Sequence, residues 1–132
     1  MKRFFRFTGF AFIMLTGMVQ AQELTFTDAQ VDTGIALYEE FCVECHGDRL
    51  DNGRFATPIK GFFFTNKWGG KSLGELARFT YEEMPEGNGK YLNIDEYIAL
   101  IAYILSENGF TSSGTALSED FSELDGITLS FD

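Results

Sequence analysis

The chain has 132 residues, a length that fits one small domain and excludes a large catalytic architecture. Twenty acidic and ten basic side chains give it a formal net charge of −10. Proteins that bind nucleic acid neutralise phosphates with clustered lysine and arginine, so this charge argues against nucleic-acid partners.

The first 21 residues have the pattern of a secretory signal peptide. Lys2, Arg3 and Arg6 precede an apolar stretch over residues 7–19, and small residues lie at the processing positions that end at Ala21. The apolar stretch is shorter than the roughly 20 residues that a membrane-spanning helix needs. We therefore predict cleavage after Ala21 and no stable membrane insertion of the product.

Cleavage changes the charge of the chain and its compartment. It removes three of the ten basic residues and none of the twenty acidic ones, so the net charge of the mature chain becomes 7 − 20 = −13. We expect an exported protein, which in a Gram-negative bacterium lies in the periplasm.

A first helix is expected to lead into the two cysteines of the chain. Asp32 can cap this helix, and Gly34, Tyr38, Phe41 and Cys45 recur along it at three- and four-residue spacing. That spacing places them on one face, so the helix delivers the cysteines to a fixed position.

The cysteines belong to the sequence Cys42-Val43-Glu44-Cys45-His46. This is the pattern of c-type haem attachment, in which both thiols form thioether bonds to the porphyrin and the adjacent imidazole binds the iron. Two intervening residues bring both sulfurs near the haem edge, and the next residue turns its imidazole under the iron. The mature chain keeps no other cysteine or histidine, and its one methionine is Met84.

Two other uses of the cysteines are open to the sequence. In an oxidising compartment they can form a structural disulfide or a dithiol–disulfide redox pair, but a thioredoxin-like pair follows a strand, and here a helix precedes it. A zinc site normally has four protein ligands, or three when it is catalytic, and three ligands packed within five residues give poor tetrahedral geometry.

A loop and a short helix should follow the haem motif. Turn-forming residues predict the loop over residues 47–61. Ser72 and Glu75 form a capping box ahead of apolar residues at helical spacing, so a helix should begin there and end near Tyr81.

A longer amphipathic helix should close the domain. Asn93 and Glu96 form its capping box, and Asn108-Gly109 stops it. No strand pattern is found, and three helices are a thin core for so small a chain. A porphyrin lined by aromatic side chains would fill the middle, so we predict an all-α fold with three to four short helices around one covalently bound haem.

The arrangement resembles the monohaem class I c-type cytochromes, over roughly residues 30–110. The shared features are the helix that leads into the haem motif, a Met-Pro pair and the last amphipathic helix. The matching segments are Gly34-x-x-x-Tyr38, Pro58 twelve residues beyond His46, Trp68-Gly69-Gly70, Met84-Pro85 and the run from Ala102 to Phe110. Together they look like the cytochrome c domains that serve quinoprotein alcohol dehydrogenases.

The resemblance implies a cytochrome c-like fold and a set of haem contacts. Cys42 and Cys45 would hold haem c, with His46 and Met84 as the two ligands of its iron. The first and last helices of the domain would cross near Gly34, Tyr38, Ile98 and Ala102.

Two further contacts follow from the same resemblance. The carbonyl of Pro58 would accept the proton on the other nitrogen of His46, which orients the imidazole. Trp68 would donate its indole N–H to a haem propionate.

An iron with two strong axial ligands leaves no open position for a substrate, so we predict a one-electron carrier and not an enzyme. A thioether ligand from Met84 raises the reduction potential because it favours ferrous iron. Without Met84 as ligand, the alternative is a five-coordinate haem that binds gases or acts like a peroxidase. The third hypothesis is a dithiol–disulfide oxidoreductase that uses Cys42 and Cys45.

The domain prediction places the cytochrome c domain at residues 22–110 and an acidic C-terminal extension at residues 111–132. Part of the extension should pack on the domain because apolar residues recur in it at Leu117, Phe121, Leu124 and Ile127. Because the mature chain is acidic, its redox partners are expected to present a basic patch. The candidate partners are a quinoprotein dehydrogenase and a terminal oxidase.

Overall fold

The computed structural model describes residues 23–131, which form helices joined by loops. The helices are α1 (Asp28–Phe41), α2 (Val43–His46), α3 (Phe62–Trp68), α4 (Leu73–Glu83), α5 (Ile94–Glu107) and α6 (Phe121–Leu124). Within the described residues the only β-type pairing is one isolated bridge, between Ser72 and Thr128. The predicted all-α fold is confirmed, although α3 and two helices of four residues bring the number above three to four.

The predicted signal peptide lies outside the described residues, so cleavage after Ala21 stays a prediction. Between residues 23 and 131, no helix combines the length and the apolar character that crossing a bilayer requires. The haem motif and the other predicted site residues all lie inside the described range.

Capping boxes set where two of the helices begin, as predicted. Before α4, the Ser72 hydroxyl accepts a hydrogen bond from the Glu75 N–H at 3.1 Å, and the Glu75 carboxylate accepts one from the Ser72 N–H at 2.9 Å. Before α5, the Glu96 carboxylate accepts from the Asn93 N–H at 2.8 Å. Each box satisfies N–H groups that have no partner inside the helix.

The predicted start of the first helix at Asp32 is wrong. Thr27 caps α1, because its side chain accepts from the Gln30 N–H and the Gln30 side chain accepts from the Thr27 N–H, both at 3.2 Å. Asp32 therefore lies inside α1. A Thr-x-x-Gln box upstream of the apolar repeat is the signal that the sequence prediction overlooked. At α4, the last helical residue is Glu83, slightly beyond the predicted end near Tyr81.

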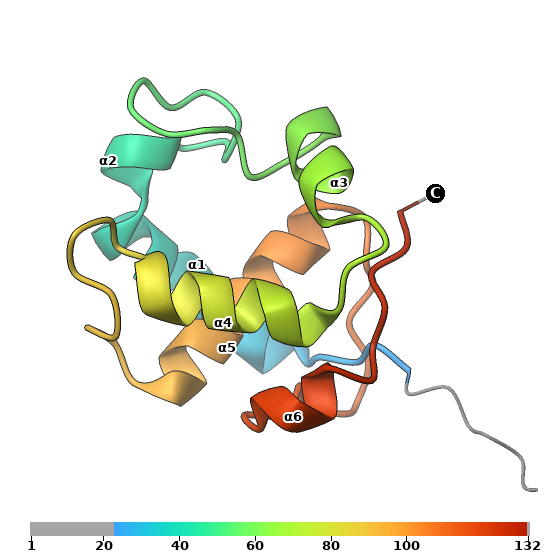
Figure 1. The fold of residues 1–132 in the computed structure, drawn as a ribbon. Helices are drawn as coiled ribbons and strands as arrows, with labels where there is room; N and C mark the ends of the chain where they lie inside the picture. The colour runs from blue at the N-terminus through green and yellow to red at the C-terminus, as the bar shows by residue number, and fades with distance from the viewer. Residues whose placement is uncertain (1–22, 132) are drawn as a thin grey trace, which may run out of the picture.

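The backbones of α1 and α5 touch at Gly34, where the two helices cross behind α4 (Figure 1). A Cβ atom at Gly34 would overlap the carbonyl oxygen of Ala99 and lie 2.8 Å from the Cβ of Tyr103. One turn further along α1, the rings of Tyr38 and Tyr103 meet edge to face with centroids 5.5 Å apart. The predicted crossing is confirmed, and its other members, Ile98 and Ala102, are fully buried.

The loop over residues 47–61 is present as predicted, but sequence patterns do not predict the short helix α3 that follows it. Three consecutive phenylalanines hide its periodicity, and Gly61 before it offers no capping side chain. In the structure Phe64 and Trp68 form its buried face. Its other face leaves Phe62 74% exposed.

The C-terminal segment after α5 packs along α4 (Figure 1). Its backbone pairs with the start of α4, where the Leu73 N–H donates to the Ile127 carbonyl and the Leu129 N–H to the Lys71 carbonyl, both at 2.8 Å. The Arg78 guanidinium donates to both carboxylate oxygens of Asp125, each at 2.6 Å. The apolar residues Leu117, Leu124, Ile127 and Leu129 are buried.

The contact at Gly34 gives a stability prediction. Gly34→Ala should lower the free energy of unfolding by at least about 2 kcal/mol, because the added methyl group overlaps the backbone of α5. Chemical denaturation of the full chain measures this. The control is Gly114→Ala, where an added Cβ meets nothing within 4 Å and the expected change is within about 0.5 kcal/mol. A stabilised Gly34→Ala variant, as helix propensity alone would give, would contradict the close crossing.

Candidate haem-binding site

A cavity of about 390 Å³ is lined by residues of α2, the loop over residues 47–61, α3 and α4. In the ribbon, α2, this loop and α3 lie above α4 (Figure 1). The last turn of α1 and one face of α5, from Tyr97 to Ile104, complete its lining. All six predicted site residues line it: Cys42, Cys45, His46, Pro58, Trp68 and Met84. Most of the remaining lining is aromatic or aliphatic: Tyr38, Phe41, Phe55, Ile59, Phe63, Phe64, Leu76, Phe79, Leu92, Tyr97, Leu100 and Ile104.

A tight turn of backbone presents the cysteines and the histidine together. Cys42 is the cap residue between α1 and α2. Its carbonyl accepts hydrogen bonds from the N–H groups of Cys45 at 3.2 Å and His46 at 3.0 Å. Both thiols are free. Burial, followed by the nearby Cys45 thiol, raises the pKa of Cys42 to about 11.

Gly53 lets the following loop close tightly over this turn. A Cβ atom at Gly53 would overlap the Cys45 carbonyl oxygen and lie 2.6 Å from the Cα of His46. The loop therefore passes directly against the backbone of the motif, a close approach that only a glycine permits.

His46 is held by the loop, but by a different carbonyl from the one predicted. Its Nδ1 donates to the carbonyl oxygen of Thr57 at 3.2 Å, so the assignment of this role to Pro58 is wrong. A residue before proline favours extended backbone, and successive carbonyls of extended backbone point in opposite directions. Residue spacing alone does not decide which of the two neighbouring carbonyls faces the ring.

The environment of His46 favours the neutral imidazole. Burial lowers its pKa, and the hydrogen bond to Thr57 partly opposes this shift. With the proton on Nδ1, the nitrogen Nε2 carries the free lone pair that a metal ligand needs.

Met84 lies where α4 ends. Its N–H donates to the Thr80 carbonyl at 3.1 Å, and its own carbonyl accepts from the Tyr97 hydroxyl at 2.6 Å. Tyr97 lies on α5 and is fully buried. The position of Met84 is therefore fixed from two helices, α4 and α5.

Trp68 forms one end of the cavity together with two residues that sequence patterns do not single out. Its ring meets that of Phe79 with centroids 5.4 Å apart. The ammonium nitrogen of Lys67 lies 4.2 Å from the centroid of the Phe79 ring and 5.1 Å from that of Trp68. A lysine ammonium group and an indole N–H on one cavity are both donors that a carboxylate group of a ligand can accept from.

Thr57, Tyr97 and Lys67 are the site residues that the sequence analysis missed. Tyr97 and Lys67 lie on helices at positions where core packing or solvent exposure explains their residue types equally well. Thr57 acts through its backbone, which leaves no trace in the identity of the side chain.

The donor set and the lining fit a haem. Two thiols, an imidazole and a thioether share one mainly apolar cavity, which lies within the range of about 300–1,000 Å³ that small-ligand sites occupy. A Cys-x-x-Cys-His turn with a methionine on the same cavity defines a c-type cytochrome domain.

The family comparison identifies the chain more closely. Residues 29–104, more than half of the chain, match the family described as cytochrome c oxidase, cbb3-type, subunit III, and the chain belongs to this family. Its cofactor is therefore covalently bound haem c with its iron. No curated protein and no solved structure matches the chain significantly.

Proposed function

We propose that this protein is a periplasmic one-electron carrier of the class I type and not an enzyme. The observation that carries the proposal is the position of Cys42, Cys45, His46 and Met84 on one cavity. When bound there, haem iron takes up and gives up one electron by cycling between the ferric and ferrous states.

Each residue of the site has a part in this proposal. Cys42 and Cys45 would hold the porphyrin through thioether bonds, while His46 and Met84 would bind its iron. The carbonyl of Thr57 keeps the His46 ring in one orientation and increases its basicity. The apolar lining excludes water and disfavours the additional charge of ferric iron, which raises the reduction potential.

The dithiol–disulfide hypothesis is not supported by the state of Cys42. Catalytic dithiols have an attacking thiol with a lowered pKa, because the thiolate is the nucleophile. Burial raises the pKa of Cys42 to about 11, which is a shift in the opposite direction. The position of Met84 on the cavity likewise favours a six-coordinate iron over a five-coordinate one.

We infer that a quinoprotein dehydrogenase is the electron donor and a terminal oxidase the acceptor. The likeness to the cytochrome domains of quinoprotein alcohol dehydrogenases supports the donor. The family description, which names a subunit of a cbb3-type oxidase, supports the acceptor. Trp68 and Lys67 would bind a haem propionate. The assignment to class I and the export to the periplasm are supported by the sequence pattern.

Covalent attachment is the first test. Haem should stay with the polypeptide when the full chain, exported from a host that matures c-type haem, is denatured in acid and solvent. A Cys42→Ser, Cys45→Ser double variant should lose its haem under the same treatment. Haem that leaves the unaltered chain on denaturation would refute the proposed function.

Replacement of Met84 tests the sixth ligand. Met84→Ala should abolish the low-spin spectrum of ferric haem and lower the reduction potential, because the thioether no longer stabilises ferrous iron. Tyr97→Phe should have a smaller effect of the same sign, since it removes only the hydrogen bond to the Met84 carbonyl. Glu83→Gln, one residue away, is the control. An unchanged spectrum in Met84→Ala would indicate a different ligand or an open site.

The net charge of the mature chain gives a prediction about partners. Electron-transfer rates with a basic redox protein should fall as salt is added, because screening weakens the attraction between opposite charges. Stopped-flow kinetics over a range of ionic strength measure this, and an acidic redox protein should show the opposite trend. Rates that do not respond to salt would count against electrostatic docking.

A further inference from the structure

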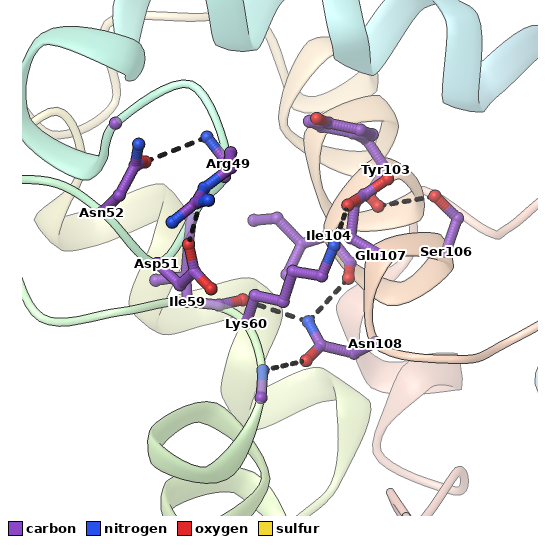
Figure 2. Close-up of polar contacts among 12 residues, drawn as sticks. Arg49, Asp51, Asn52, Ile59, Lys60, Tyr103, Ile104, Ser106, Glu107 and Asn108 are labelled. Carbon is purple, nitrogen blue, oxygen red and sulfur yellow. Dashed lines mark hydrogen bonds and ion pairs between the residues drawn. The ribbon is translucent and has the colours of Figure 1, made fainter.

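One side chain at the end of α5 ties that helix to the loop that holds His46 (Figure 2). The Asn108 amide nitrogen donates to the carbonyls of Ile59 at 3.0 Å and Ile104 at 2.8 Å. Its amide oxygen accepts from the Gly61 N–H at 3.0 Å. One residue therefore bridges α5 and two points of the loop.

The ion pair next to Asn108 connects the same two segments. Lys60 and Glu107 meet at 2.6 Å, but their side chains are 38% and 32% exposed. Exposed ion pairs contribute little because solvent and salt screen them. Asn108 makes three hydrogen bonds, two of them to backbone groups of the loop, and is therefore the main connection.

The connection extends from Asn108 to His46 through a short, stiff segment. Ile59 is fixed on both sides, since its carbonyl accepts from Asn108 and its N–H donates at 2.8 Å to the carbonyl of the fully buried Leu50. Between Ile59 and Thr57 lies Pro58, whose ring restricts the backbone. Movement of Ile59 is therefore passed on to the Thr57 carbonyl, which accepts the hydrogen bond of His46.

We propose that Asn108 is a positioning residue for the axial histidine: it anchors the loop so that the Thr57 carbonyl stays in line with Nδ1 of His46. This inference rests on the proposed function. A well-formed hydrogen bond at Nδ1 makes the imidazole a stronger electron donor, which favours ferric iron. Loss of the anchor weakens that bond, so the reduction potential rises.

The test compares Asn108→Ala with a matched variant, Gln30→Ala, in the full haem-containing chain. Gln30 also makes three side-chain hydrogen bonds, with Thr27 and with both backbone groups of Leu117, and it does not line the cavity. Both variants should lose stability. Asn108→Asp is the second variant, because it keeps the size and the acceptor for Gly61 but loses the donor to Ile59 and Ile104.

Two readouts separate positioning from general destabilisation. NMR measures how fast the His46 Nδ1 proton and the Ile59 amide proton exchange with solvent. Both rates should become about tenfold faster in Asn108→Ala and Asn108→Asp. The ratio of ferrous to ferric protein at a fixed potential should rise about threefold, or about 30 mV for one electron. Gln30→Ala should change neither.

The outcomes distinguish this inference from the proposed function. A chain that carries no haem would refute both. A haem-containing Asn108→Ala or Asn108→Asp variant with the potential and the Nδ1 exchange rate of the unaltered protein would refute the inference alone. Equal shifts in Gln30→Ala would also overturn it, because they would show that any loss of stability has the same effect.

Discussion

The contact of two helix backbones at Gly34 determines where the parts of the site lie. α1 ends directly before the turn that carries the cysteines and His46, and residues of α5 line the same cavity. Because a glycine allows these helices to touch, the distance between the motif and α5 is set by backbone atoms and not by adjustable side chains. A shift at this crossing would displace the motif relative to the rest of the cavity.

The helix α5 supports both sides of the candidate iron site. Near its beginning, the Tyr97 hydroxyl holds the Met84 carbonyl, and at its end Asn108 holds the loop that orients His46. Neither hydrogen bond involves the sulfur of Met84 or the ring of His46. Each acts on the backbone around a ligand, so α5 serves as a rigid frame against which two loops are positioned.

The sequence predicted which residues line the cavity, but not the contacts that support them. The capping boxes at Ser72 and Asn93 are local patterns, and the structure places them as expected. The Cys-x-x-Cys-His segment is also local, and its cysteines and histidine lie on one cavity. The cap at Asp32 and the carbonyl of Pro58 were wrong because neighbouring residues offered the same hydrogen bond. The role of Tyr97 depends on a contact between distant segments, which no local pattern records.

The pairing of the C-terminal segment with the start of α1 joins parts of the chain that lie far apart in sequence. The Gln30 side chain binds Leu117, 87 residues later, and the Phe26 carbonyl accepts from the Ser113 N–H at 2.7 Å. The first helix of the domain therefore gains these contacts only when residues 113–117 are available to it. The segment that leads into Cys42 and Cys45 is therefore held at its beginning by residues that follow the last long helix, α5.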